Sequence, residues 1–426
     1  MVDAVQKVLA VLACCAVLAG CGAAVGTLPA AHVSSASAGP SVPASCSTAA
    51  LRTFANVLKR VYHEGVLSER TASAEYLIAN SSALRAAVED DSRSAARAAV
   101  KALLKTGHMT DVTIVRSHHT LVAVGGPALA PLHGTLTGAN GEPIATYLAS
   151  VWAAESFLTE AGGITNGLVA LRRGERTVDG SPSLPGGPLP ARGTLTRAGV
   201  AYDYTSFPVS AYPSGSLRVY LLQPTRTIAK LCGRTQQDTH VNALERVAEL
   251  IYAAEIGRTA LLQVHRVQRN KPLLEAVAHQ EPEATRLAID ALLNEHIVRI
   301  RVSVGGKLLQ DVGGPYVLAP VSAPLRLGGH TIGELTLSVQ DDEGYLRLAR
   351  RLAGLDVLMY MGPEHVLVKD SLGPLPGPSL AAVPASGSSS YNGRSFRVFT
   401  VNAQAFPSGP LVIRVLVPSP SRPTRP

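Results

Sequence analysis

Two arginines have the type and the spacing to bind an acidic ligand. Arg299 and Arg301 alternate with apolar residues, so on a β-strand both guanidinium groups project from one face. A guanidinium group binds a carboxylate through two parallel hydrogen bonds. The pair therefore predicts a site for a carboxylate. The alternative interpretation is a solvated face of the sheet, because arginine side chains are mostly exposed.

A second group of polar residues lies where a predicted strand meets a predicted helix. Gln340, Asp342 and Tyr345 could together hold a cationic group there. The alternative is an aspartate that caps the helix and a tyrosine that packs in the core. In the stretch about 188 residues earlier, Tyr147 and Trp152 could wall an apolar pocket or belong to an ordinary core. That stretch lacks the acidic residues, so a polar ligand is expected in the second half of the chain.

The sequence contains no signature of catalysis or of metal binding. It has no nucleophile elbow, no HExxH, no CxxC and no paired-carboxylate pattern. We therefore expect a protein that is not an enzyme and that has no cofactor and no metal ligands. The formal net charge is +8. Because no dense basic run interleaved with aromatic residues accompanies that charge, we expect no nucleic-acid partner.

The first residues predict export from the cytoplasm. Lys7 precedes an apolar run over residues 8–18, which is the pattern of a secretory signal and is too short for a stable membrane span. The run ends in Leu-Ala-Gly-Cys, which resembles the lipobox of bacterial lipoproteins. This pattern predicts a signal peptide over residues 1–20 and lipidation of Cys21. Residues 21–46, rich in Ala, Ser, Gly and Pro, would form a flexible tether to the cell membrane.

Two cysteines remain once the signal peptide and the lipidated residue are set aside. Cys46 and Cys232 are an even pair in a compartment that we expect to be oxidising. They occupy matching positions in the two halves of the chain, so we predict a disulfide between them. Two unpaired thiols are the alternative.

The chain contains an internal repeat. Residues 124–131 recur at 312–320, and their Gly-Gly-Pro sequences are 188 residues apart. Residues 211–215 (AYPSG) match residues 405–409 (AFPSG), 194 residues later. One offset of this size indicates two copies of a domain and not a solenoid, whose repeats span about 20–50 residues. We expect domains over residues 47–226 and 232–418, with a disordered tail over 419–426.

Hydrophobic periodicity predicts the same elements in both copies. The first copy is expected to start with helices over residues 48–78 and 82–105, followed by mostly antiparallel strands and one inserted short helix. The second repeats this order, with its inserted helix over residues 342–352. The predicted fold class is α+β, with two tandem domains that each have an antiparallel sheet, a long N-terminal helix and helices packed on the sheet.

These features resemble the Cache family, the extracytoplasmic PAS-like sensor domains of bacteria. The resemblance is carried by the long N-terminal helix, the hairpin over residues 301–311, the Gly-Gly-Pro break that follows it, and the strand over residues 331–339 that leads into a short helix. It covers nearly all of residues 48–418. It implies PAS-like sheets that bind a small molecule, often a carboxylate or an amino acid.

The resemblance and the lipobox together give a functional hypothesis. We expect a lipid-anchored sensor outside the cytoplasm that binds a small molecule without catalysis. Because no second apolar run follows in the sequence, a partner protein would carry the signal onward. The alternatives are a cell-envelope hydrolase and a purely structural envelope lipoprotein.

Overall fold

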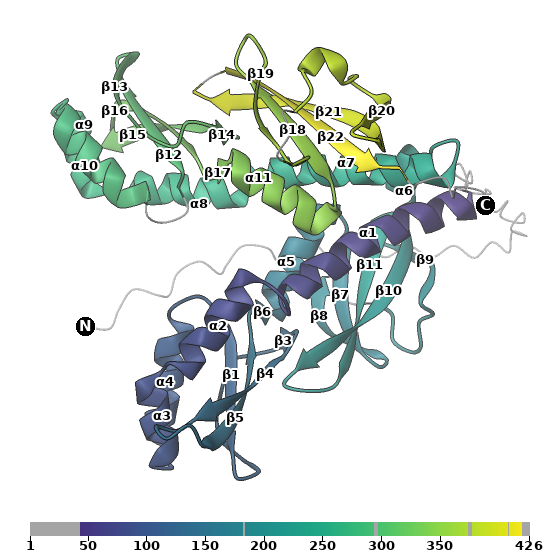
Figure 1. Ribbon diagram of the computed structural model, residues 1–426, viewed down its shortest axis with the longest axis vertical. Helices are drawn as coiled ribbons and strands as arrows, with labels where there is room; N and C mark the ends of the chain where they lie inside the picture. Colours follow the sequence, from purple (N-terminus) through teal and green to yellow (C-terminus); the bar gives the residue numbers. More distant parts are fainter. Residues whose placement is uncertain (1–42, 182–183, 294–296, 374–376, 408, 420–426) are drawn as a thin grey trace, which may run out of the picture. The chain divides into compact units, whose positions relative to one another are not determined.

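The computed structural model describes residues 43–181, 184–293, 297–373, 377–407 and 409–419 (Figure 1). The predicted signal peptide, Cys21 and nearly all of the predicted tail lie outside the described residues. The chain divides into residues 1–41 and a compact unit over residues 42–426. No helix in the described ranges is both long and apolar enough to cross a membrane.

The first repeat combines six helices with two antiparallel sheets in its described residues. Its small sheet has the strand order β2-β1-β5-β4, and its large sheet has the order β6-β3-β10-β11-β7-β8, with β9 paired to β10. In chain order the elements are α1 (Ala44–Glu64), α2 (Glu69–Ala79), α3 (Ser82–Glu89), α4 (Arg93–Leu104), β1 (Asp111–Arg116), β2 (His119–Val124), β3 (Ala128–Leu129), β4 (Leu132–Thr137), β5 (Pro143–Ser150), β6 (Trp152–Ala153), α5 (Ala154–Thr165), β7 (Leu168–Arg173), β8 (Arg176–Ser181), β9 (Arg192–Arg197), β10 (Val200–Tyr212), β11 (Ser216–Pro224) and α6 (Thr225–Leu231).

The second repeat has the same topology. Its small sheet has the order β13-β12-β16-β15, and its large sheet has the order β17-β14-β21-β22-β18-β19, with β20 paired to β21. In chain order the elements are α7 (Gln236–Glu255), α8 (Arg258–Val267), α9 (Lys271–Ala278), α10 (Pro282–Leu293), β12 (Arg299–Val304), β13 (Lys307–Gly313), β14 (Val317–Leu318), β15 (Val321–Leu327), β16 (His330–Ser338), β17 (Gln340–Asp341), α11 (Asp342–Leu348), the π-helical turn η1 (Ala349–Ala353), β18 (Asp356–Met361), β19 (Val366–Asp370), the 3₁₀ turn η2 (Leu380–Ala382), β20 (Gly387–Tyr391), β21 (Arg394–Phe406) and β22 (Gly409–Pro418).

Local geometry repeats together with the topology. Gly125 and Gly313 both have φ = +134°, a conformation that favours glycine. A Cβ on Gly313 would overlap the backbone of the neighbouring strand at Arg299. In each repeat a serine at the end of the small sheet, Ser150 or Ser338, donates a hydrogen bond to a carbonyl group of the large sheet. These shared details indicate two copies of one unit.

The sequence predicts one sheet in each copy, and the structure corrects this to two. The Gly-Gly-Pro break takes the chain out of the small sheet, so the short strands β3 and β14 pair with the large sheet. Ala130 and Ala319, both at φ = 51°, then turn the chain back into the small sheet. The short segment from β3 to β4 is therefore divided between two sheets.

The two helices expected over residues 48–78 and 82–105 are each divided in two. Helix α1 ends at Gly65, where a Cβ would overlap the indole of Trp152. A capping box at Ser68 and Thr71 then starts α2. Ser92 caps α4 by accepting a hydrogen bond from Ala95 N, directly after a left-handed residue at Asp91. The apolar periodicity continues across both breaks, so periodicity alone did not reveal them.

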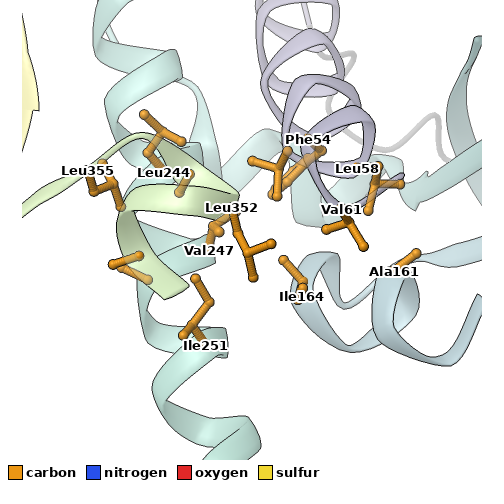
Figure 2. Close-up of a cluster of buried hydrophobic side chains, with 14 of the residues drawn as sticks. Phe54, Leu58, Val61, Ala161, Ile164, Leu244, Val247, Ile251, Leu352 and Leu355 are labelled. Atoms are coloured by element: carbon orange, nitrogen blue, oxygen red, sulfur yellow. The ribbon is translucent and has the colours of Figure 1, made fainter. Parts of the chain in front are cut away.

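The largest apolar core is shared by the two repeats. In Figure 2, Phe54, Leu58 and Val61 of α1 lie near side chains of α7 (Leu244, Val247 and Ile251), and Leu352 and Leu355 lie beside them. The predicted disulfide is confirmed, and it joins Cys46 at the start of α1 to Cys232 just after α6, with 5.6 Å between the two Cα atoms. The two halves are therefore fixed to each other by a common core and a covalent bond.

Candidate ligand-binding site

The small sheet of the second repeat has one covered face and one open face. Its apolar residues, such as Ile300 and Leu335, belong to a core that also contains Leu273, Val277 and Ile289 of α9 and α10. The residues that alternate with them are polar. Because side chains alternate across a strand, this places Arg301, Ser303, Thr336, Glu334 and Ser322 together on the open face.

A groove of about 520 Å³ runs across this sheet at the end that carries the β12–β13 turn. Ser303 and Glu334 contribute polar atoms to its lining, and Ser322 lies beside them on the edge strand. Ser322 and Thr336 share a hydrogen bond of 2.8 Å between their hydroxyl groups. The complete lining consists of residues 303–306, 322–324 and 331–334. The groove is large enough for a small-molecule ligand, since such sites span about 300–1,000 Å³.

The predicted arginine pair lies next to this groove and holds an internal carboxylate. Asp311 on β13 accepts hydrogen bonds from Nε of Arg299 at 2.7 Å and from Nε and Nη2 of Arg301 at 3.0 and 2.6 Å. The ring of Phe406 packs against both guanidinium groups, 5.3 and 5.1 Å from their Cζ atoms. We refer to these residues as the Arg–Asp–Arg cluster.

The electrostatics of the cluster favour an ionised aspartate. Partial burial raises the pKa of the Asp311 carboxyl group, but the hydrogen bonds and positive charges of Arg299 and Arg301 outweigh burial and hold that pKa below its usual value. One aspartate neutralises one of the two arginines, so the cluster keeps a net positive charge. Arg301 remains 35% exposed, and its bonds to Asp311 do not use Nη1. Ser303 is two residues further along the same face, about 7 Å away.

The first repeat has no arginine at either position of this cluster. Thr113 occupies the position of Arg301, and its hydroxyl group lies 2.7 Å from the hydroxyl of Tyr212, which occupies the position of Phe406. Asp111 stands where the second repeat has Arg299, and it accepts a hydrogen bond from the Gly126 backbone at 2.6 Å. The pair of arginines that share an aspartate is therefore a property of the second repeat.

Gln340, Asp342 and Tyr345 do lie close together, at the start of α11. Asp341 caps this helix by accepting a hydrogen bond from Gly344 N at 2.7 Å. Tyr345 is fully buried and donates a hydrogen bond to the Ala248 carbonyl group at 3.2 Å. Burial raises the pKa of Asp342 and of the Tyr345 hydroxyl group. These contacts fit the capping and packing interpretation, and the binding role of the three residues stays a prediction.

The two aromatic residues predicted in the first repeat lie in different surroundings. Tyr147 is buried in the small sheet opposite Gly134, where a Cβ would overlap its ring. Trp152 is half-buried, donates a hydrogen bond to the Val61 carbonyl group at 3.2 Å, and lines a second cavity of about 190 Å³. Of these two residues, Trp152 lines a cavity, whereas Tyr147 packs within the small sheet.

Sequence reasoning missed Asp311 and Phe406. A β-bulge after Val302 shifts the β12–β13 register by one residue, so Arg301 faces Asp311. Without the bulge, the turn at Gly305 and Gly306 would place Gln310 there. Phe406 reaches the cluster from the far end of β21, and no local pattern predicts that contact.

Comparison with known proteins adds little to this description. No family model matches the chain, and no curated protein matches it. Four solved chains do match. One is an extracellular ligand binding receptor from Desulfohalobium retbaense DSM5692, with 10% sequence identity and a TM-score of 0.23; the match covers 53% of this chain and 47% of the receptor, about half its length. A likeness this low indicates neither a shared fold nor a shared function.

The described residues also contain no group of three or more His, Cys, Asp or Glu side chains placed to hold a metal ion. The polar chemistry of the candidate site is therefore that of guanidinium, hydroxyl and carboxylate groups.

Proposed function

We propose that this protein is a Cache-type sensor that binds a small molecule outside the cytoplasm. The ligand would lie in the groove of the second repeat, with an acidic group directed at Arg301. The protein would act without catalysis and would pass its ligand state to a partner protein. The observation that carries the proposal is the groove of about 520 Å³ beside a cluster with net positive charge.

The charge of the site supports an anionic ligand. Buried or half-buried arginines are usually neutralised one for one, because an unpaired charge away from water is costly. Here Asp311 serves two arginines, so one positive charge is left for a ligand. A carboxylate in the groove could bind Nη1 of Arg301 while Ser303 and Thr336 donate to its other polar groups. An amino-acid-like ligand would in addition place its ammonium group near Glu334.

The Cys46–Cys232 disulfide supports a location outside the cytoplasm, since disulfides persist mainly in oxidising compartments. Attachment to the membrane through lipidated Cys21 is part of the proposal. A Cys21→Ala variant tests it, because the variant should leave the membrane fraction and appear in the aqueous fraction. Retention of the variant in the membrane would contradict the lipid anchor.

A structural envelope lipoprotein is the second candidate, and a specific observation favours it. On the large sheets, the loops that follow β8 and β19 place Leu184 and Val383 in filled cores. Tyr220 donates a hydrogen bond to the Leu189 carbonyl group at 3.2 Å, and Tyr360 donates one to the Pro378 carbonyl group at 2.7 Å. These loops therefore cover the faces of the large sheets on which they pack. The structural candidate requires that the open groove, too, bind nothing.

A groove-filling variant tests the proposed function. The purified protein is titrated calorimetrically with a panel of small carboxylates and α-amino acids. Ser303→Trp should abolish the binding of any hit, because the indole would fill the groove. Ser388→Trp, at an exposed position on β20, is the matched control and should bind normally. Binding that survives Ser303→Trp would exclude the groove, and a panel without hits would favour the structural candidate.

A further inference from the structure

A second cavity lies where the two repeats meet. It has a volume of about 190 Å³. The first repeat contributes the end of α1, the start of α2, Trp152 and Glu160, and the second repeat contributes Leu348, Arg351 and Leu352. We refer to it as the junction pocket. It is separate from the groove, and no residue lines both.

One side of the junction pocket is apolar, and its side chains are held in place by packing and by a hydrogen bond. Val61 and Leu352 are part of the shared core shown in Figure 2. The indole of Trp152 is fixed by its hydrogen bond to Val61 and by an edge-on contact with Phe157, with 6.1 Å between the ring centroids. The close approach of Gly65 leaves the indole no room to turn toward α1. This side can accept a branched apolar group.

The other side carries four charged residues, of which two are paired with each other. Glu64 of α1 forms an ion pair with Arg351 of η1. Glu160 has no cationic partner among the described residues, and Arg70 bonds only to the carbonyl groups of His108 and Gly107, at 3.2 and 3.0 Å. Both side chains are exposed to solvent. One negative and one positive group are thus available to a ligand in the pocket.

The two repeats differ at two positions that shape this pocket. At the positions of Trp152 and Glu160, the second repeat has Gln340 and Leu348. The combination of an indole and a carboxylate is therefore specific to the first repeat.

We propose that the junction pocket binds a small zwitterion with a branched apolar side chain. The ammonium group would bind Glu160 and the face of Trp152, and the carboxylate would bind Arg70. The side chain would contact Val61 and Leu352. The pocket is smaller than the about 300 Å³ at which sites for drug-sized molecules begin, which limits the ligand to roughly the size of leucine. Because both repeats supply walls, the ligand would stabilise their contact.

The sequence provides a direct probe, because Trp152 is the single tryptophan of the chain. Titration with leucine should change the intrinsic fluorescence saturably. 4-Methylpentanoate lacks the ammonium group, and 3-methylbutylamine lacks the carboxylate. Each should therefore bind at least about tenfold more weakly than leucine, as expected when a hydrogen bond to a charged group is lost. Leucine should also raise the melting temperature.

Variants on one helix provide the matched control. Glu160→Gln should weaken leucine binding about tenfold, whereas Glu155→Gln, exposed on the same helix, should leave it unchanged. Arg70→Gln is a second, independent variant and should weaken leucine but not 3-methylbutylamine. The proposal is overturned if leucine, isoleucine and valine all leave the fluorescence unchanged, if 4-methylpentanoate binds as well as leucine, or if both glutamate variants behave alike.

Discussion

Replacing Asp311 by asparagine tests the Arg–Asp–Arg cluster most sharply. Asp311 is 13% exposed and accepts three charge-assisted hydrogen bonds of 2.6 to 3.0 Å. Removing one partner of a buried ion pair costs about 3–5 kcal/mol, and an exposed pair contributes about 0.2–1 kcal/mol. Because Arg299 is 13% exposed and Arg301 35% exposed, the cluster lies between these limits. We expect Asp311→Asn to lower the free energy of unfolding by about 2 kcal/mol.

The assay is urea-induced unfolding at neutral pH, with the midpoint and the slope fitted separately. Asp290→Asn is the matched control, because Asp290 pairs with Arg286 at 2.8 Å on an exposed helix surface, with both side chains more than 40% exposed. The control should lose much less stability, because solvent screens an exposed ion pair. The same Asp311→Asn protein should bind a carboxylate ligand more tightly than the original, since both guanidinium groups are released from their internal partner.

Two results would refute this reasoning. A loss of stability in Asp311→Asn no larger than in Asp290→Asn would mean that the cluster is a solvated surface feature. A weaker affinity of Asp311→Asn for every carboxylate that the original protein binds would mean that the arginines do not reach the ligand.

Three further predictions concern stability. The pKa of Asp311 is lowered in the folded state, so its contribution to stability is present above the unfolded pKa of about 3.9 and is lost as pH falls through the folded value. The stability difference between the original protein and Asp311→Asn should therefore shrink on acidification. A constant difference would contradict the ionised cluster. Replacing Cys46 and Cys232 by serine should cost up to about 5 kcal/mol in chemical unfolding, the chain-entropy value for residues 186 positions apart, and an unchanged unfolding midpoint would show that the shared core alone fixes the halves. Gly313→Ala should lower the free energy of unfolding by about 1–3 kcal/mol, because of the positive φ at Gly313 and the nearby Arg299 backbone. Gly314→Ala should be nearly neutral, because the new Cβ would meet only Val317 at an ordinary contact distance. Equal losses of stability in thermal unfolding would contradict this.

Some of the fold could be predicted because repeated residues lead to repeated geometry. The two Gly-Gly-Pro segments leave the small sheets at equivalent points, and the matching bonds Tyr212–Pro213 and Phe406–Pro407 are both cis. The Cys46–Cys232 disulfide could be predicted because these two cysteines remain after the signal peptide and Cys21 are set aside, and because they occupy matching positions. The number of sheets in each copy was predicted wrongly, because a two-residue strand such as β3 is too short to have a periodicity of its own.

The candidate site could be predicted only in part, because it depends on register and on distant contacts. Alternation along β12 placed Arg299 and Arg301 on one face, and they do share Asp311. The identity of their partner depends on a single-residue bulge that no sequence pattern indicates. The junction pocket depends on residues more than 280 positions apart, such as Glu64 and Arg351. Contacts of this kind arise from packing of whole elements and have no local signal.

The most direct measurement of the central claim is nuclear magnetic resonance on protein labelled with ¹⁵N-arginine. The Nε–H signal of Arg301, assigned by Arg301→Lys, is followed while small carboxylates and amino acids are added, with the exposed Arg97 on α4 of the first repeat as the internal reference. The proposed function predicts that at least one ligand shifts the Arg301 signal saturably and leaves the Arg97 signal in place. An Arg301 signal that stays fixed throughout, or that moves only together with the Arg97 signal, would contradict it.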